Sequence, residues 1–176
     1  MKNMKRSHLS GLIKKTGLAV IASTFLLAAP IAQADGHVKP AVVYDTAGKN
    51  DKSFNEAVFN GITRFMNDTG IAVTELEPTN EAMMEQSLKK FAQRGYSPVV
   101  AVGFTMANAV AAAAAEYPDT QFTIIDGVVD APNVQNVIYK EHEGSFLVGV
   151  MAAMASNSGT VGFVGGMDIP LISRFE

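Results

Sequence analysis

The stretch "SPVVAVGFTMANAVAAAAAEYPDTQFTIID", residues 97–126, decides the fold class. It begins and ends with short apolar runs, residues 97–104 and 121–126, in which Val and Ile are frequent. Such short, nearly continuous runs are typical of strands that are covered on both faces. The alanine-rich run between them, residues 105–117, favours helix strongly and stops before Pro118. Strand, helix and strand at this spacing predict a βαβ unit, and therefore a parallel sheet with a right-handed crossover.

The same alternation continues on both sides of this unit. Three further strands are predicted, at residues 40–45, 71–76 and 136–139. Two further helices are predicted because apolar residues recur at steps of three and four. These residues are Phe54, Val58, Gly61, Ile62 and Phe65 in the first helix, and Met84, Leu88 and Phe91 in the second. We therefore expect an α/β domain with a doubly wound parallel sheet of flavodoxin-like strand order.

The residues after position 140 begin a new unit. A helix is predicted over residues 141–159, a buried strand over 160–166, and the start of another helix in 167–176. One strand and two partial helices cannot close a core of their own. We therefore expect a longer protein, in which residues 35–140 form the first lobe and residues 141–176 cross a hinge into a second lobe that is only begun.

The first 34 residues have the pattern of a secretory signal peptide. Five basic residues precede an apolar run, and Ala32 and Ala34 provide the small residues of a cleavage site. A membrane anchor is the alternative, but the apolar run is shorter than the ~20 residues that span a bilayer. We therefore expect export to the periplasm and cleavage after Ala34.

The composition of the remaining chain excludes several functions. Five of the 14 basic residues and none of the 17 acidic residues precede Ala34, so nine basic and 17 acidic residues remain, with a net charge of −8. This charge repels phosphate backbones, so we expect no nucleic-acid partner. The chain has no cysteine, its three histidines lack ligand spacing, and it has no dinucleotide, phosphate-loop or nucleophile-elbow motif. We therefore expect no metal, no cofactor and no catalytic residues.

The predicted topology limits where a ligand can bind. In open parallel sheets, ligands bind beyond the carboxyl ends of the strands, near helix N-termini. This rule selects the loop after the first strand, then Gly103 and Phe104 after the third strand, and Asp126 after the fourth. A carboxylate at Asp126 suits ligand hydroxyls, ring N–H groups or a metal, and capping of the following loop is its alternative role.

The loop after the first strand runs into a helix through "AGKNDKSFNEAVFNG", residues 47–61. Ser53 and Glu56 have the spacing of a capping box, which predicts Ser53 as the N-cap. This spacing explains neither Phe54 nor Asn55. From the pattern alone, the Phe54 ring lies either in the core or in the cleft, and the Asn55 amide either in solvent or on a ligand.

Four stretches resemble, in order and spacing, the basic membrane protein family, which comprises the PnrA-like substrate-binding proteins of ABC transporters. They are "NDKSFNEAVFNG" (50–61), "VGFTMANAVAAAAAEYPDTQFTIID" (102–126), "NVQNVIYKEHEGSFLVGVMAAMAS" (133–156) and "VGFVGGMDIPLISRFE" (161–176). The resemblance covers residues 38–176. It implies a type I periplasmic binding fold, in which hinge motion encloses a ligand between two lobes.

The resemblance also implies a ligand and a site. Members of the family bind purine nucleosides or related heterocycles such as riboflavin. The base is expected to stack on Phe54, and side chains near it are expected to bond the base edge or the ribose hydroxyls. Two residues of the second lobe are expected to face the same cleft. The complete expected site is Asp51, Ser53, Phe54, Asn55, Gly103, Phe104, Asp126, Met167 and Asp168.

We therefore expect a monomeric periplasmic receptor without catalytic activity, which delivers a nucleoside-like ligand to an ABC permease. Riboflavin or a sugar is the alternative ligand. A secreted nucleoside-processing enzyme is the alternative class, but it needs a cluster of metal-binding acids, and the first loop provides only Asp45 and Asp51. Many family members carry a lipid-modified Cys at the signal junction, and its absence here favours free diffusion.

Overall fold

The computed structural model describes residues 38–176. The predicted signal peptide and its cleavage site after Ala34 lie outside the described residues. The described part of the chain contains one sheet, followed by a helical segment after residue 140.

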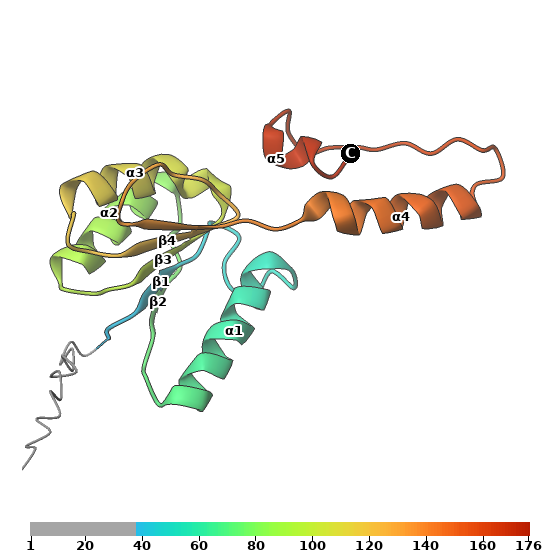
Figure 1. The fold of residues 1–176 in the computed structure, drawn as a ribbon. Coiled ribbons are helices and arrows are strands. Elements are labelled where there is room, and N and C mark those ends of the chain that lie inside the picture. Colours follow the sequence, from blue (N-terminus) through green and yellow to red (C-terminus); the bar gives the residue numbers. More distant parts are fainter. Residues whose placement is uncertain (1–37) are drawn as a thin grey trace, which may run out of the picture. The chain divides into compact units, whose positions relative to one another are not determined.

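The sheet has five strands, and all neighbouring strands are parallel (Figure 1). The strands are β1 Ala41–Val43, β2 Thr74–Leu76, β3 Val99–Val102, β4 Phe122–Ile125 and β5 Val134–Val137. Their order across the sheet is β2-β1-β3-β4-β5, the flavodoxin-like order of a doubly wound fold. The predicted α/β class, parallel sheet and strand order are therefore confirmed.

Alternate residues of the central strands point to opposite faces of the sheet. Ala41 and Val43 belong to an apolar cluster with residues of α2 (Glu81–Gln93) and α3 (Ala107–Glu116). Val42 and Tyr44 belong to a second cluster, with residues of α1 (Phe54–Thr69). Helices α2 and α3 therefore cover one face and α1 covers the other (Figure 1).

The two faces differ in how tightly they are packed. On the α2–α3 face, Leu88, Val110 and Phe122 are almost completely buried. On the α1 face, the predicted apolar stripe of α1 does point toward the sheet, but its members are only partly buried, and Phe65 is 39% exposed. Asn55 is the one residue of α1 that is fully buried. The α1 face therefore contains a groove between α1 and the sheet.

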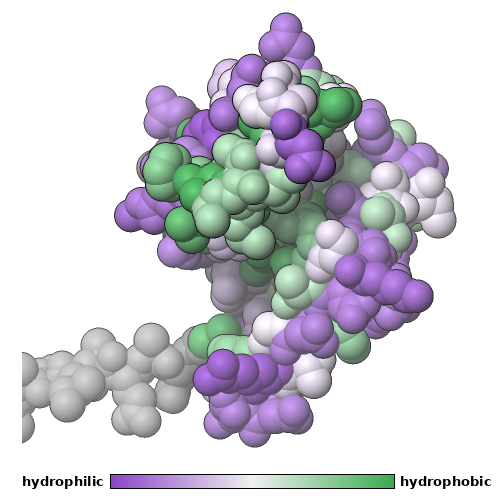
Figure 2. Space-filling view, turned by 90° about the vertical axis from the view of Figure 1, so that its right-hand side faces the viewer, coloured by the Kyte–Doolittle hydropathy of each residue, from purple (hydrophilic) through white to green (hydrophobic). Residues whose placement is uncertain are grey.

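The chain leaves the sheet after β5 and forms α4 (Glu141–Ala155) and α5 (Pro170–Ser173). Helices at both positions were predicted and are confirmed. Apolar side chains lie on all sides of α4, and Leu147, Met151 and Met154 are each more than 60% exposed. Figure 2 views the molecule from the right-hand side of Figure 1 and shows hydrophobic residues at the surface, between hydrophilic ones. A helix that is apolar all round is typical of a buried position.

The buried strand predicted over residues 160–166 is wrong. These residues form no strand, and Val164 is 96% exposed. A strand is stable only when a neighbouring strand accepts and donates its backbone hydrogen bonds. None of the described strands pairs with this stretch, so its apolar composition alone does not order it into a sheet.

Candidate functional site

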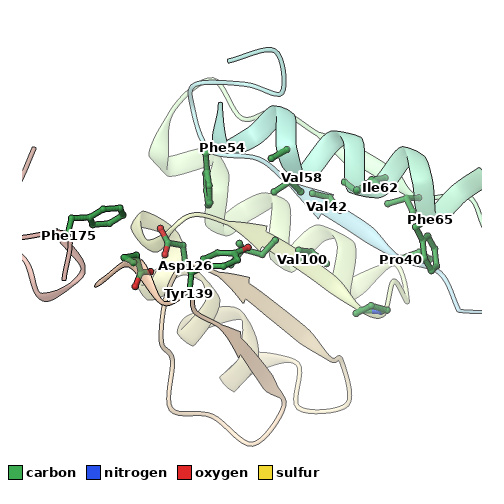
Figure 3. Close-up of a pocket in the computed structure, with 16 residues that line it drawn as sticks. Pro40, Val42, Phe54, Val58, Ile62, Phe65, Val100, Asp126, Tyr139 and Phe175 are labelled. Carbon is green, nitrogen blue, oxygen red and sulfur yellow. The ribbon is translucent and has the colours of Figure 1, made fainter. Parts of the chain in front are cut away.

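A cavity of about 790 Å³ lies between α1 and the sheet (Figure 3). The α1 stripe from Phe54 to Phe65 forms one wall, and apolar residues of β1 and β3 form the other. The lining residues run from Pro40 and Phe65 at one end to Phe54, Asp126 and Tyr139 at the other (Figure 3). The end lined by Phe54, Asp126 and Tyr139, called the upper end, lies at the carboxyl ends of the strands. Parallel sheets bind ligands at these strand ends.

Asp51 organises the loop that leads into α1. One carboxylate oxygen accepts hydrogen bonds from the backbone N–H groups of Ser53 (2.8 Å) and Glu56 (3.1 Å). The other accepts from the backbone N–H of Asn55 (3.0 Å) and from its side-chain amide (3.2 Å). These bonds, led by that from the Asn55 backbone, lower the pKa of Asp51. Asp51 therefore satisfies the free N–H groups of the first turn of α1.

The predicted capping box is consequently wrong. Ser53 does occupy the N-cap position, but its side chain makes no capping hydrogen bond. Asp51 lies two residues earlier and has a longer side chain than serine. Its carboxylate accepts from the Glu56 N–H, which a Ser53 hydroxyl would bind in a capping box, and from the Ser53 N–H, which the Glu56 side chain would bind. Ser53 is exposed, and its predicted ligand contact stays a prediction.

Asn55 joins two carboxylates from the inside of the loop. It is 0% exposed, and its amide nitrogen donates to Asp45 at 2.7 Å and to Asp51 at 3.2 Å. The opposite amide orientation is excluded, because it directs the amide oxygen at two carboxylates. Its oxygen has no hydrogen-bond partner among the described residues. Asn55 therefore fixes the position of Asp45, and its predicted contact with a ligand stays a prediction.

Asp45 was not among the predicted site residues, although it directly follows β1 and the same strand-end rule selects it. One of its oxygens accepts from Asn55 and from the backbone N–H of Ala47 (2.8 Å). The other accepts no hydrogen bond from residues 38–176 and lies 3.7 Å from the position of a Cβ built on Gly103. Asp45 therefore presents a fixed acceptor at the strand ends.

Gly103 and Phe54 lie against this acceptor. Gly103 has a φ of 103°, a conformation that favours glycine, and a Cβ at this residue would lie 3.8 Å from the Phe54 ring. Phe54 is partly buried against the core cluster of Val42 and Tyr44, and the rest of its ring faces the cavity (Figure 3). The Phe54 ring therefore contacts the core and also lines the cavity, and its predicted stacking on a ligand stays a prediction.

Asp126 stands at the end of β4 with a left-handed φ of 64°. Its backbone N–H donates to the carbonyl of Val137 (2.7 Å), which holds it on the edge of the sheet. Its carboxyl lines the upper end of the cavity (Figure 3). Burial, and then the charge of Glu141, raise the pKa of this carboxyl, whereas Arg174 opposes the rise. Non-glycine residues with such φ values often occur at functional sites.

The remaining predicted residues lie at different distances from this centre. Phe104 begins the single turn η1 (Phe104–Met106), and its Cα lies 3.3 Å from the position of a Cβ built on Gly127. Met167 is 56% exposed and Asp168 is exposed, both ahead of α5 and neither lining the cavity. The structure therefore brings Phe54, Gly103, Phe104 and Asp126 to one edge of the sheet, and does not bring Met167 and Asp168 there.

The strand-end groups offer one apolar surface and several hydrogen-bond acceptors. The site combines one aromatic ring with carboxylate acceptors, and in residues 38–176 no three His, Cys, Asp or Glu side chains lie close enough to hold a metal ion. A ring offers a flat apolar surface, and carboxylates accept hydrogen bonds from hydroxyl or N–H donors. A strand-end site of this composition on a doubly wound sheet defines an α/β domain for a small polar ligand.

The chain belongs to the family of PnrA-like substrate-binding proteins of ABC transporters, whose family model matches residues 38–176. It is 32% identical over 144 residues to the ABC transporter nucleoside-binding protein BmpA of Lactococcus lactis subsp. cremoris, a match that covers 79% of this chain and 41% of that protein. It is 34% identical over 145 residues to an uncharacterized lipoprotein of Pyrococcus furiosus, covering 79% of this chain and 36% of the lipoprotein.

Solved structures agree with this assignment. A solute-binding protein of an ABC transporter system from Aeropyrum pernix superposes with a TM-score of 0.69 at 31% identity, over 78% of this chain and 40% of that one. The fold is therefore that of type I periplasmic binding proteins, as the resemblance implied. The chain spans about two-fifths of the length of these relatives.

The family also bears on location and activity. It is a family of substrate-binding proteins rather than enzymes, and it includes lipoproteins, which are extracytoplasmic. Within residues 38–176, no helix has the length and apolar character needed to cross a bilayer.

Proposed function

We propose that this protein captures a nucleoside-like ligand, a purine nucleoside in the first instance, for delivery to an ABC permease. The observation that carries the proposal is the position of Phe54. Its half-buried ring lies at the carboxyl ends of the strands, beside the free oxygen of Asp45 and near the carboxyl of Asp126.

The chemistry of this edge matches the chemistry of a nucleoside. Stacking of a base on an aromatic ring contributes about 1–3 kcal/mol. Ribose hydroxyls and ring N–H groups are donors, and the free oxygen of Asp45 and the carboxyl of Asp126 are acceptors. The L. lactis relative is described as nucleoside-binding, which supports the same ligand class.

The described residues offer half of such a site. We propose that residues 35–140 form the first lobe, that residues 141–176 lead into a second, and that Met167 and Asp168 reach the ligand when the lobes close. Export with cleavage after Ala34 and a monomeric state belong to the same proposal. The net charge of −8 after Ala34 supports a free ligand rather than nucleic acid.

A thermal-shift screen of the full-length protein tests the ligand class. Inosine, adenosine, free bases, riboflavin and sugars are compared at equal concentration. A ligand at about 100 times its dissociation constant adds roughly 2.7 kcal/mol of stability, which is readily seen as a rise in Tm. A rise with sugars alone contradicts the proposal, and turnover of any nucleoside contradicts the receptor function.

Phe54→Ala tests the residue that carries the proposal. We expect the variant to weaken nucleoside binding by about five- to 150-fold, because base stacking contributes about 1–3 kcal/mol. Phe65→Ala is the matched control, since Phe65 lies on the same stripe of α1 but at the opposite end of the cavity. Equal weakening by both variants, or unchanged binding in Phe54→Ala, shows that Phe54 is a core residue only.

A further inference from the structure

We propose that Glu141 and its ion-pair partner Arg174 adjust the charge of Asp126, and with it the pH range over which Asp126 accepts hydrogen bonds from a ligand. The inference rests on the proposed function only in taking Asp126 as a ligand acceptor. It assigns a role to two residues that lie outside the predicted site.

Glu141 is held in one place by its surroundings. It is the first residue of α4, and its side chain is only 5% exposed. Arg174 binds it with two nitrogens, Nε at 3.0 Å and Nη2 at 3.4 Å. A guanidinium that binds both oxygens of a carboxylate fixes its orientation as well as its charge. Glu141 and Asp126 both line the cavity.

Three groups face the Asp126 carboxyl: Glu141 from α4, Arg174 from the end of α5, and Tyr139 from the segment between β5 and α4. Burial raises the pKa of Glu141, but hydrogen bonds and the charge of Arg174 outweigh it and hold this pKa below its ordinary value. The pKa of Asp126 is raised, by burial first and by Glu141 second. Glu141 therefore stays ionised, and Asp126 is the carboxyl that takes up a proton first.

This division of charge has a consequence for binding. An ionised Asp126 accepts hydrogen bonds from ligand donors, whereas a protonated Asp126 has a donor of its own and fewer acceptor positions. Because the pKa of Asp126 is raised, donor-rich ligands lose affinity as the pH falls through that raised value. Burial contributes most to the raised pKa of Asp126, and the charges of Glu141 and Arg174 shift the pH of this loss in opposite directions.

Two variants of the full-length protein shift this loss in opposite directions. Glu141→Gln removes the like charge beside Asp126, so we expect the low-pH loss of inosine binding to move down by about half a pH unit or more. Arg174→Met removes the opposing positive charge, so we expect the loss to move up by a similar amount. Glu143→Gln is the matched control, because Glu143 lies two residues along α4, is exposed and pairs with Lys140.

Titration of the Asp126 carboxyl by NMR, with its signal assigned from Asp126→Asn, provides the second measurement and needs no ligand. Opposite shifts of its midpoint in Glu141→Gln and Arg174→Met support the inference. If both variants only weaken binding and leave the midpoint in place, the ion pair is merely structural and the inference is overturned. An equal shift in Glu143→Gln also overturns it. If the wild-type protein binds no inosine at any pH, the proposed function fails, and the NMR titration still decides the role of Glu141.

Discussion

Asn55 offers the sharpest test of how the strand-end site is held together. Its buried amide nitrogen donates to the carboxylates of Asp45 and Asp51. Asn55→Asp keeps the size of the side chain but replaces these two attractive contacts with repulsion between carboxylates. We expect Asn55→Asp to be far more destabilising than Asn55→Ala.

The expected magnitudes follow from the surroundings of the side chain. A hydrogen bond to a charged group contributes about 1.5–3 kcal/mol, and Asn55→Ala removes such a bond to Asp45. The same substitution removes a buried amide oxygen that has no partner among the described residues, which returns about 1 kcal/mol or more. We therefore expect a net loss of about 0.5–2 kcal/mol in the free energy of unfolding of Asn55→Ala.

Asn55→Asp adds a buried acid beside two carboxylates. Burial and like charges raise the pKa of such a group by about 3–5 units. At about 1.4 kcal/mol per unit, this costs roughly 4–5 kcal/mol at pH 7.5, because a group whose folded pKa lies above 7.5 is protonated there instead of ionised. The cost is full above the raised pKa in the folded state. It decreases as the pH falls and disappears below the pKa of the unfolded chain, about 3.9.

Urea unfolding of the full-length wild-type protein, Asn55→Ala and Asn55→Asp at pH 7.5 and pH 5 measures these differences. We expect the gap between Asn55→Asp and the wild-type protein to narrow at pH 5, while the gap for Asn55→Ala changes little. A pH-independent loss in Asn55→Asp, or a loss no larger than that of Asn55→Ala, refutes the assignment of the amide nitrogen to the two carboxylates.

Two further substitutions test loops at the two ends of the sheet. The buried side chain of Asn133 donates from one nitrogen to the carbonyls of Ala114 (3.2 Å), Tyr117 (3.1 Å) and Thr120 (3.0 Å). Asn133→Ala therefore leaves buried acceptors unsatisfied, and we expect a loss of about 2–3 kcal/mol in urea unfolding, whereas an unchanged midpoint contradicts this. A Cβ on Gly127 would lie 2.7 Å from Ile124 Cδ1 and 3.3 Å from the Phe104 backbone, so we expect Gly127→Ala to cost about 1–3 kcal/mol and lower the Tm. A Tm equal to that of the wild-type protein shows that the loop moves freely away from Phe104.

The sheet was predictable because its information is local. Each strand is a short apolar run with a helix pattern beside it, and the crossover rule then leaves few topologies. The stretch 160–166 has the same composition, but whether an apolar run becomes a strand depends on a neighbour that composition does not describe. The error there therefore arose from tertiary structure, not from the pattern.

The site was predictable only as far as chain position determines it. The strand-end rule located Phe54, Gly103 and Asp126, and the structure brings all three to one edge. The hydrogen bonds that position them were not predictable, because they depend on loop geometry. The capping of α1 by Asp51 instead of Ser53 is such a case, and the bond from Asn55 to Asp45, ten residues earlier, is another.

The four hydrogen bonds that Asp51 accepts have a consequence for the thermodynamics and kinetics of ligand capture. Phe54 is the first residue of a helix whose opening turn is already tied down, so its backbone has little freedom left to lose when a ligand arrives. The conformational entropy of Phe54 is lost when the protein folds, so ligand binding does not lower it again. Substitutions in this loop are therefore expected to reduce the fraction of molecules that are competent to bind. They raise the apparent Kd, while the intrinsic affinity of the ordered Phe54 ring is unchanged.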